Sequence, residues 1–166
     1  MNEQYGDSLS HEEHPKHRTL KDVELPDIFI DDRIQNLVRA LRSIDVPTEG
    51  SCEGHLDMDK HQHPWVTFSP LYVFKRKALS HLVDGYNQEN DIRWYVNESS
   101  VQPLTHIDLL TCCNTETDFI PYNQRGPLKI PGEVLGRLQN DSDILADYIF
   151  NNRKNSVVRE LVARSE

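Results

Sequence analysis

The side chains with the greatest chemical capability are gathered in one short segment, residues 48–63. This segment holds the thiol of Cys52 and the imidazoles of His55, His61 and His63. Two residues separate Cys52 from His55, a spacing that lets both side chains turn onto one metal ion. His61 and His63 point to the same side if the chain between them is extended. Because thiolate and imidazole suit zinc and other borderline-soft metals, the segment predicts a metal site of this kind.

A further ligand is expected from the second half of the chain. The chain has three cysteines, and two of them, Cys112 and Cys113, are adjacent. An odd count with an adjacent pair argues against a disulfide scaffold, and reduced thiols are typical of the cytosol. Cys112 or Cys113, at the end of a predicted strand, could complete a tetrahedral set with Cys52 and His55.

An alternative interpretation makes Cys52 a catalytic nucleophile. Gly50 and Gly54 leave its surroundings open, and His55 or His106 could act as the base. Backbone amides near Gly54 could form a nest for an oxyanion. A third interpretation is a polar loop without chemistry, in which Cys52 packs in the core.

The elements that must position this segment follow from the spacing of apolar residues. The segment 34–44 is apolar at every third or fourth position, which predicts a helix capped by Asp31 or Asp32 and ended by Pro47. Alternating patterns predict strands, and 3.6-residue periodicity predicts helices. The expected strands are a short one near residue 50, followed by 65–69, 92–97 and 106–112. The other expected helices are 73–86 and a segmented helical tail over 134–162.

These elements predict an α+β fold. The expected architecture is a two-layer domain with a mixed or antiparallel four-stranded sheet and helices packed mainly on one face. We expect residues 1–26 to form a flexible arm and residues 27–166 to form this single domain, with a helical C-terminal tail. Asp141 or Ser142, and Ser156, are predicted to cap the helices of the tail.

Composition narrows the class of protein. The 166 residues carry a net charge of -9, which disfavours nucleic acid as a partner because nucleic acid is bound largely through its phosphates. We interpret two short basic segments as solvated helix faces, the pair Arg153-Lys154 and the run Lys75-Arg76-Lys77. No apolar run approaches the roughly 20 residues of a membrane span, and the start lacks a signal-peptide pattern. We therefore expect a cytoplasmic protein without a membrane partner.

The turn around Cys52 also carries a resemblance. Ser51-Cys52-Glu53-Gly54-His55, with Thr48 before it and a strand after it, resembles a group of small uncharacterised bacterial and phage proteins with a Thr-x-x-Ser-Cys-x-Gly-His turn. It is more distantly similar to the Thr-x-Ser-Ser-Cys-Ser-Gly-Arg element of the wybutosine-synthesis tRNA methyltransferase family. Thr48, Ser51, Cys52 and Gly54 match that element, and His55 replaces its arginine. The second resemblance implies S-adenosylmethionine as a ligand and tRNA as a substrate.

Two functions from different classes follow. The first is a small metal-dependent or thiol-dependent enzyme centred on Cys52 and His55 and acting on a small molecule. The second is a non-catalytic binding or regulatory domain with a protein partner. In that case the apolar stripe at the end of the tail could support a homodimer, or it could pack on its own sheet. The stripe consists of Val157, Val158, Leu161 and Val162.

Overall fold

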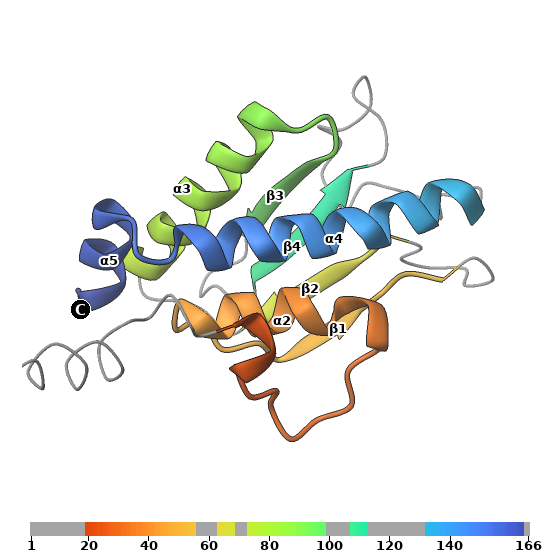
Figure 1. Ribbon diagram of the computed structural model, residues 1–166, viewed down its shortest axis with the longest axis horizontal. Helices are drawn as coiled ribbons and strands as arrows, with labels where there is room; N and C mark the ends of the chain where they lie inside the picture. Colours follow the sequence, from red (N-terminus) through yellow and green to blue (C-terminus); the bar gives the residue numbers. More distant parts are fainter. Residues whose placement is uncertain (1–18, 56–62, 69–72, 99–106, 113–131, 165–166) are drawn as a thin grey trace, which may run out of the picture.

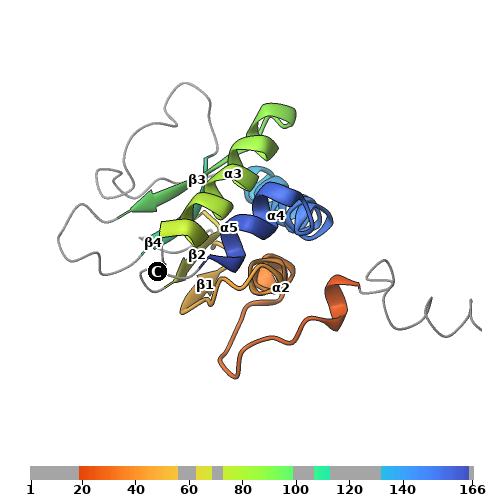
Figure 2. The same ribbon diagram turned by 90° about the vertical axis from the view of Figure 1, so that its left-hand side faces the viewer.

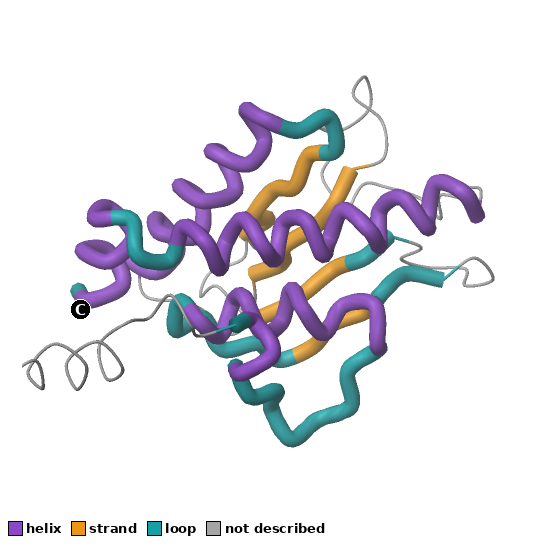
Figure 3. Tube along the Cα trace, viewed as in Figure 1, coloured by secondary structure: helices purple, strands orange, loops and turns teal. Residues whose placement is uncertain are grey.

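The computed structural model describes residues 19–55, 63–68, 73–98, 107–112 and 132–164, drawn in colour in Figure 1. Two pairs of consecutive strands are separated by one helix and flanked by helices, and Figure 3 shows the same trace by secondary structure. Their order is η3 (Leu20–Asp22), η4 (Asp32–Ile34), α2 (Gln35–Ser43), β1 (Gly50–Cys52), β2 (Trp65–Phe68), α3 (Val73–Glu89), β3 (Arg93–Glu98), β4 (Ile107–Cys112), α4 (Gly132–Asn152) and α5 (Ser156–Ala163). The α+β class predicted from the sequence is confirmed.

The strands form one antiparallel sheet in the order β1-β2-β4-β3. β1 lies at an edge, where Cys52 is opposite Trp65. β4 lies between β2 and β3, with Leu110 opposite both Trp65 and Tyr95. Figure 2 shows the helices together on one side of this sheet. The short strand β1 therefore places the segment after Cys52 at an edge of the sheet.

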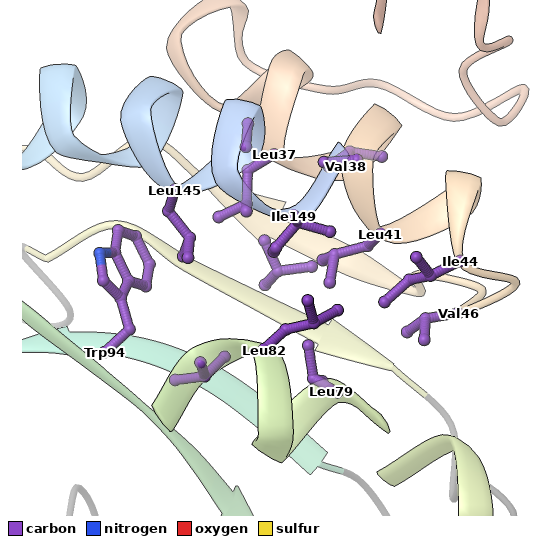
Figure 4. Packing of buried hydrophobic residues seen from close by; sticks show 14 of the residues in the cluster. Leu37, Val38, Leu41, Ile44, Val46, Leu79, Leu82, Trp94, Leu145 and Ile149 are labelled. Atoms are coloured by element: carbon purple, nitrogen blue, oxygen red, sulfur yellow. The ribbon is translucent and has the colours of Figure 1, made fainter. Parts of the chain in front are cut away.

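The core lies between the sheet and the helices (Figure 4). In β2 the alternation predicted from the sequence is present, because Val66 and Phe68 are fully buried while Trp65 and Thr67 are partly exposed. Side chains from helices far apart in the sequence complete the cluster. They include Ile34, Leu37, Val38 and Leu41 from the first helical region, Leu79, Leu82 and Tyr86 from α3, and Leu145 and Ile149 from α4.

The first helix begins differently from the prediction. The residue that precedes α2 is Ile34, and neither it nor Asp31, which precedes η4, makes a side-chain capping hydrogen bond. The turn of 3-10 helix lets Ile34 enter the core, where it is fully buried. Asp31 therefore occupies the predicted cap position, at the start of η4, but without a capping hydrogen bond, and its carboxylate is used elsewhere.

The tail also differs, because the predicted break at Asp141 or Ser142 is absent. α4 is one continuous helix, and both residues are buried within it. The Ser142 hydroxyl donates to the carbonyl of Gln139, three residues back in the same helix, at 2.6 Å. Before α5, the cap is Asn155 rather than the predicted Ser156, and its side chain accepts from the Val157 N–H. A buried polar residue with partners inside the fold does not have to end a helix.

The apolar stripe of the tail packs within the chain. α5 lies against α3, Val158 is fully buried, and Val162 packs against the core. Only Val157 among the four residues is a largely exposed hydrophobic side chain, at 44%. The stripe is thus used mainly by the domain itself.

The described part of the predicted arm contacts the domain. Val23 is buried at 4% exposure, and the Arg39 and Arg42 side chains donate to the carbonyls of Val23 and Glu24. The packed chain therefore includes residues before Pro26, while residues 1–18 lie outside the described residues. Among the helices that the structure describes, none has both the length and the apolar character needed to cross a membrane.

Candidate metal centre

Three side chains with metal-binding atoms meet beside the end of β1. One oxygen of Asp31, the sulfur of Cys52 and one imidazole nitrogen of His55 all lie within 4.8 Å of one another. The pair His55 Nε2 and Asp31 Oδ2 is 3.9 Å apart. Within the described ranges of the chain, this is the one group of three or more such residues that close together.

The backbone around Gly54 brings Cys52 and His55 to the same point. Cys52 is the last residue of β1, so its position is held by pairing with Trp65. Gly54 is buried and has a φ of 87°, a left-handed conformation that glycine adopts without steric cost. Its N–H donates to the Cys52 sulfur at 3.4 Å. The tight turn thereby allows His55 to approach the thiol that precedes it by three residues.

Asp31 reaches the site through a pair of hydrogen bonds with the other side of this turn. The Glu53 N–H donates to Asp31 Oδ2 at 3.2 Å, and the Arg33 N–H donates to Glu53 Oε2 at 2.9 Å. The start of η4 and the end of β1 thus satisfy each other's backbone groups. From α4, the Gln139 side chain donates to the Glu53 carbonyl at 3.1 Å. Three elements distant in sequence therefore hold the turn and its carboxylate in place.

The donor atoms and their exposure fit a bound cation. The Asp31 side chain is 20% exposed and the His55 side chain 38%, so the group lies partly open to solvent. Tetrahedral zinc sites have bonds of about 2.0–2.3 Å, which put pairs of ligand atoms about 3.3–3.8 Å apart. The His55–Asp31 separation of 3.9 Å is close to that value.

The electrostatics of Cys52 favour a protonated thiol when no cation is present. Burial raises the pKa of the Cys52 thiol, the Gly54 N–H opposes this shift, and the negative charge of Asp31 adds to it. The thiol also donates a hydrogen bond to Asp31, which further stabilises the protonated form. Reactive cysteines have the opposite environment, because positive charge or a helix N-terminus lowers their pKa. None of the charges that shift the pKa of Cys52 is positive, so its surroundings differ from those of a low-pKa cysteine.

The other residues that the sequence predicts as ligands or as a base do not join this group among the described residues. His63 is described and buried, yet it does not belong to the group formed by Asp31, Cys52 and His55. His61 and His106 lie outside the described residues. Cys112 is the last residue of β4, where it pairs with Arg93, and the structure describes its backbone but not its side chain. The role predicted for His61 and Cys112 as ligands stays a prediction.

Asp31 is the site residue that sequence reasoning missed as a ligand. It precedes Cys52 by 21 residues, and its position before a helix made capping the natural interpretation. No local spacing links it to the Cys52 turn. The one signal in the sequence was the acidic pair Asp31-Asp32. A helix cap needs only one of these two residues, which leaves the other carboxylate for a second role.

Comparisons of the chain with protein-family models, curated proteins and solved structures found no match. The resemblance to the phage and bacterial turn, and the distant one to the wybutosine-synthesis methyltransferases, therefore stays a prediction.

Proposed function

We propose that this protein binds one zinc-class divalent ion through Asp31, Cys52 and His55. The observation that carries the proposal is the meeting of a carboxylate oxygen, a sulfur and an imidazole nitrogen within 4.8 Å. Oxygen, sulfur and nitrogen donors of these types are the ligands that zinc uses in proteins.

The charge balance at the site supports a cation. A carboxylate and a thiol share a half-buried space, and the charge of Asp31 disfavours a thiolate at Cys52. A divalent ion between the two groups would offset this repulsion. Binding would displace the thiol proton, so uptake of the ion releases a proton and strengthens with rising pH. The negative charge of Asp31 then becomes favourable, because it faces a cation instead of a thiolate.

The number of ligands favours a reactive site over a structural one. Structural zinc sites in proteins have four protein ligands, whereas catalytic sites have three and keep one position for water or substrate. The described residues supply three. We infer that the fourth position takes water or an oxygen of a small molecule. The ion would then polarise the bound small molecule or deprotonate the bound water. A reduced Cys52 is required, consistent with a cytoplasmic location.

The test is metal binding by the purified full-length chain. We expect one zinc ion per chain by elemental analysis, and a sulfur-to-metal charge-transfer band when cobalt replaces zinc. Cys52→Ala removes that band, and Asp31→Asn and His55→Ala each weaken zinc binding by at least about tenfold. Absence of stoichiometric metal in protein purified without a chelator would overturn the proposal.

Two controls separate this centre from other histidines and cysteines. His81→Ala changes an exposed histidine of α3 and should leave zinc binding unchanged. Replacement of His11, His14 and His17 by alanine removes weak metal binding by the N-terminal histidines. Cys112→Ser tests the fourth ligand predicted from the sequence. If this variant still binds one zinc ion per chain but binds it more weakly, Cys112 is a ligand and the site is four-coordinate and structural.

A further inference from the structure

A second concave site lies at the opposite end of α2 from the metal centre. A cavity of about 390 Å³ is lined by Ser43, Arg153, Lys154 and Arg159. Ser43 is the last residue of α2, Arg153 and Lys154 form the turn after α4, and Arg159 lies on α5. Figure 2 looks onto this end of the molecule and shows α2, the end of α4 and α5 side by side.

The charge of this cavity is unusual for the chain. Three of its four lining residues are cations, although the chain as a whole carries a net charge of -9. Within the part of the chain that the structure describes, neither Lys154 nor Arg159 takes part in an ion pair. The pKa of Lys154 is lowered by partial desolvation and by the positive charges of Arg153 and Arg159. Lys154 is thus repelled by both arginines, and an anion beside it would offset that repulsion.

The fold holds the guanidinium of Arg153 in place before any ligand arrives. The guanidinium of Arg153 stacks on the Phe150 ring, 3.6 Å from its centroid, and donates to the Phe150 carbonyl. The turn is closed by the Asn155 N–H, which donates to the Asn152 carbonyl at 3.0 Å. α5 begins at Ser156, so the positive end of its dipole follows Lys154 directly. A fixed guanidinium such as that of Arg153 binds an anion at a smaller entropic cost than a mobile side chain does.

We propose that this cavity, the Arg153–Lys154–Arg159 pocket, binds a phosphate dianion, either inorganic phosphate or the terminal group of a small phosphomonoester. Guanidinium groups match the oxygens of phosphate in a planar, paired geometry, and a lysine adds a point charge. Three cations at one spot suit a single phosphate group. A nucleic acid strand would need basic residues in a stripe, which an acidic chain is poorly placed to supply.

Titration calorimetry on the full-length chain tests this pocket. The protein is first treated with a chelator, so that phosphate cannot bind through a metal at the Cys52 turn. Sodium phosphate and adenosine 5′-monophosphate are the probes, with sodium chloride at equal ionic strength as the reference. We expect saturable binding of one phosphate group per chain, weakened about tenfold in Lys154→Gln and in Arg159→Gln.

The matched control is Lys77→Gln, which removes one exposed cation from α3 outside the pocket. Its affinity should equal that of the wild type. Binding of both probes supports an inorganic phosphate site, and binding of the nucleotide alone supports a phosphomonoester site. The proposal is overturned if neither probe binds, if the two pocket variants bind normally, or if Lys77→Gln loses as much affinity as they do. Binding of an oligoribonucleotide without binding of either probe overturns it in favour of nucleic acid.

Discussion

The hydroxyl of Tyr86 donates a 2.6 Å hydrogen bond to Asp141 Oδ1 inside the core. The second oxygen, Oδ2, accepts from the Trp94 indole N–H at 2.7 Å. One carboxylate of α4 thereby joins α3 and β3, and all three residues are at most 6% exposed. Because buried polar groups are costly without partners, this arrangement allows a polar cluster within an apolar interior. Asp141 is therefore the residue whose substitution tests how the layers are held together.

Asp141→Leu should lower the free energy of unfolding by about 3 kcal/mol or more. It leaves the Tyr86 hydroxyl and the Trp94 N–H buried without an acceptor, and each such group costs about 1–3 kcal/mol. Asp141→Asn keeps one acceptor oxygen for Trp94, and the Tyr86 hydroxyl can turn to accept from the new amide, so its effect should be smaller. Urea denaturation of both variants measures the difference. Equal losses would show that the shape of the site, and not its hydrogen bonds, determines the stability.

The same carboxylate should make stability depend on pH. Burial raises the pKa of Asp141, while the hydrogen bonds from Tyr86 and Trp94 oppose the shift. Between the ordinary and the raised pKa, the folded state binds more protons than the unfolded state, so this group loses stabilisation as pH rises through that window. The free energy of unfolding of the wild type, relative to Asp141→Asn, should therefore increase as pH is lowered toward the ordinary carboxyl pKa. A difference that stays constant from pH 7 to pH 4 would contradict a raised pKa.

Gly54→Ala should destabilise the fold and weaken the metal centre together. Alanine at a φ of 87° costs about 1–2 kcal/mol, and relief of that strain would move His55 away from Cys52. The matched control is Gly136→Ala in α4, where an added Cβ meets nothing within 4 Å. That change should raise stability by about 0.5–1 kcal/mol, because alanine favours the helix. Thermal unfolding and zinc titration of both variants check the pair, and normal zinc binding by Gly54→Ala would show that the turn does not position His55.

Alkylation of Cys52 should be slow at neutral pH in metal-free protein. Its raised pKa leaves little thiolate, and the rate should increase as pH approaches that raised value. Asp31→Asn removes a negative charge that raises the pKa, so it should speed the reaction. Iodoacetamide labelling followed by peptide mapping separates Cys52 from Cys112 and Cys113. Fast labelling of wild-type Cys52 at pH 7 would favour the nucleophile interpretation instead.

Much of the secondary structure could be predicted from the sequence, because it follows from local periodicity. The alternation in Trp65–Phe68 and the apolar residues of Val73–Glu89 give a strand and a helix close to the expected limits, although α3 continues three residues beyond Tyr86. Helix ends were less predictable. Asp141 and Ser142 have the residue types of caps, yet their partners come from α3, β3 and η4, which no local pattern reveals.

The sequence by itself determined that Cys52 and His55 would be near each other, because two residues and a glycine turn separate them. Only the tertiary structure decided that Asp31 joins them and that Arg159 joins Arg153 and Lys154. The physical reason is that these partners are brought in by packing between elements. Glu53 exchanges hydrogen bonds with Asp31 and Arg33 across the junction of β1 and η4, and burial of Val158 sets α5 against α3. Short-range spacing specifies which residues of one turn can meet, whereas burial of the core decides which turns meet each other.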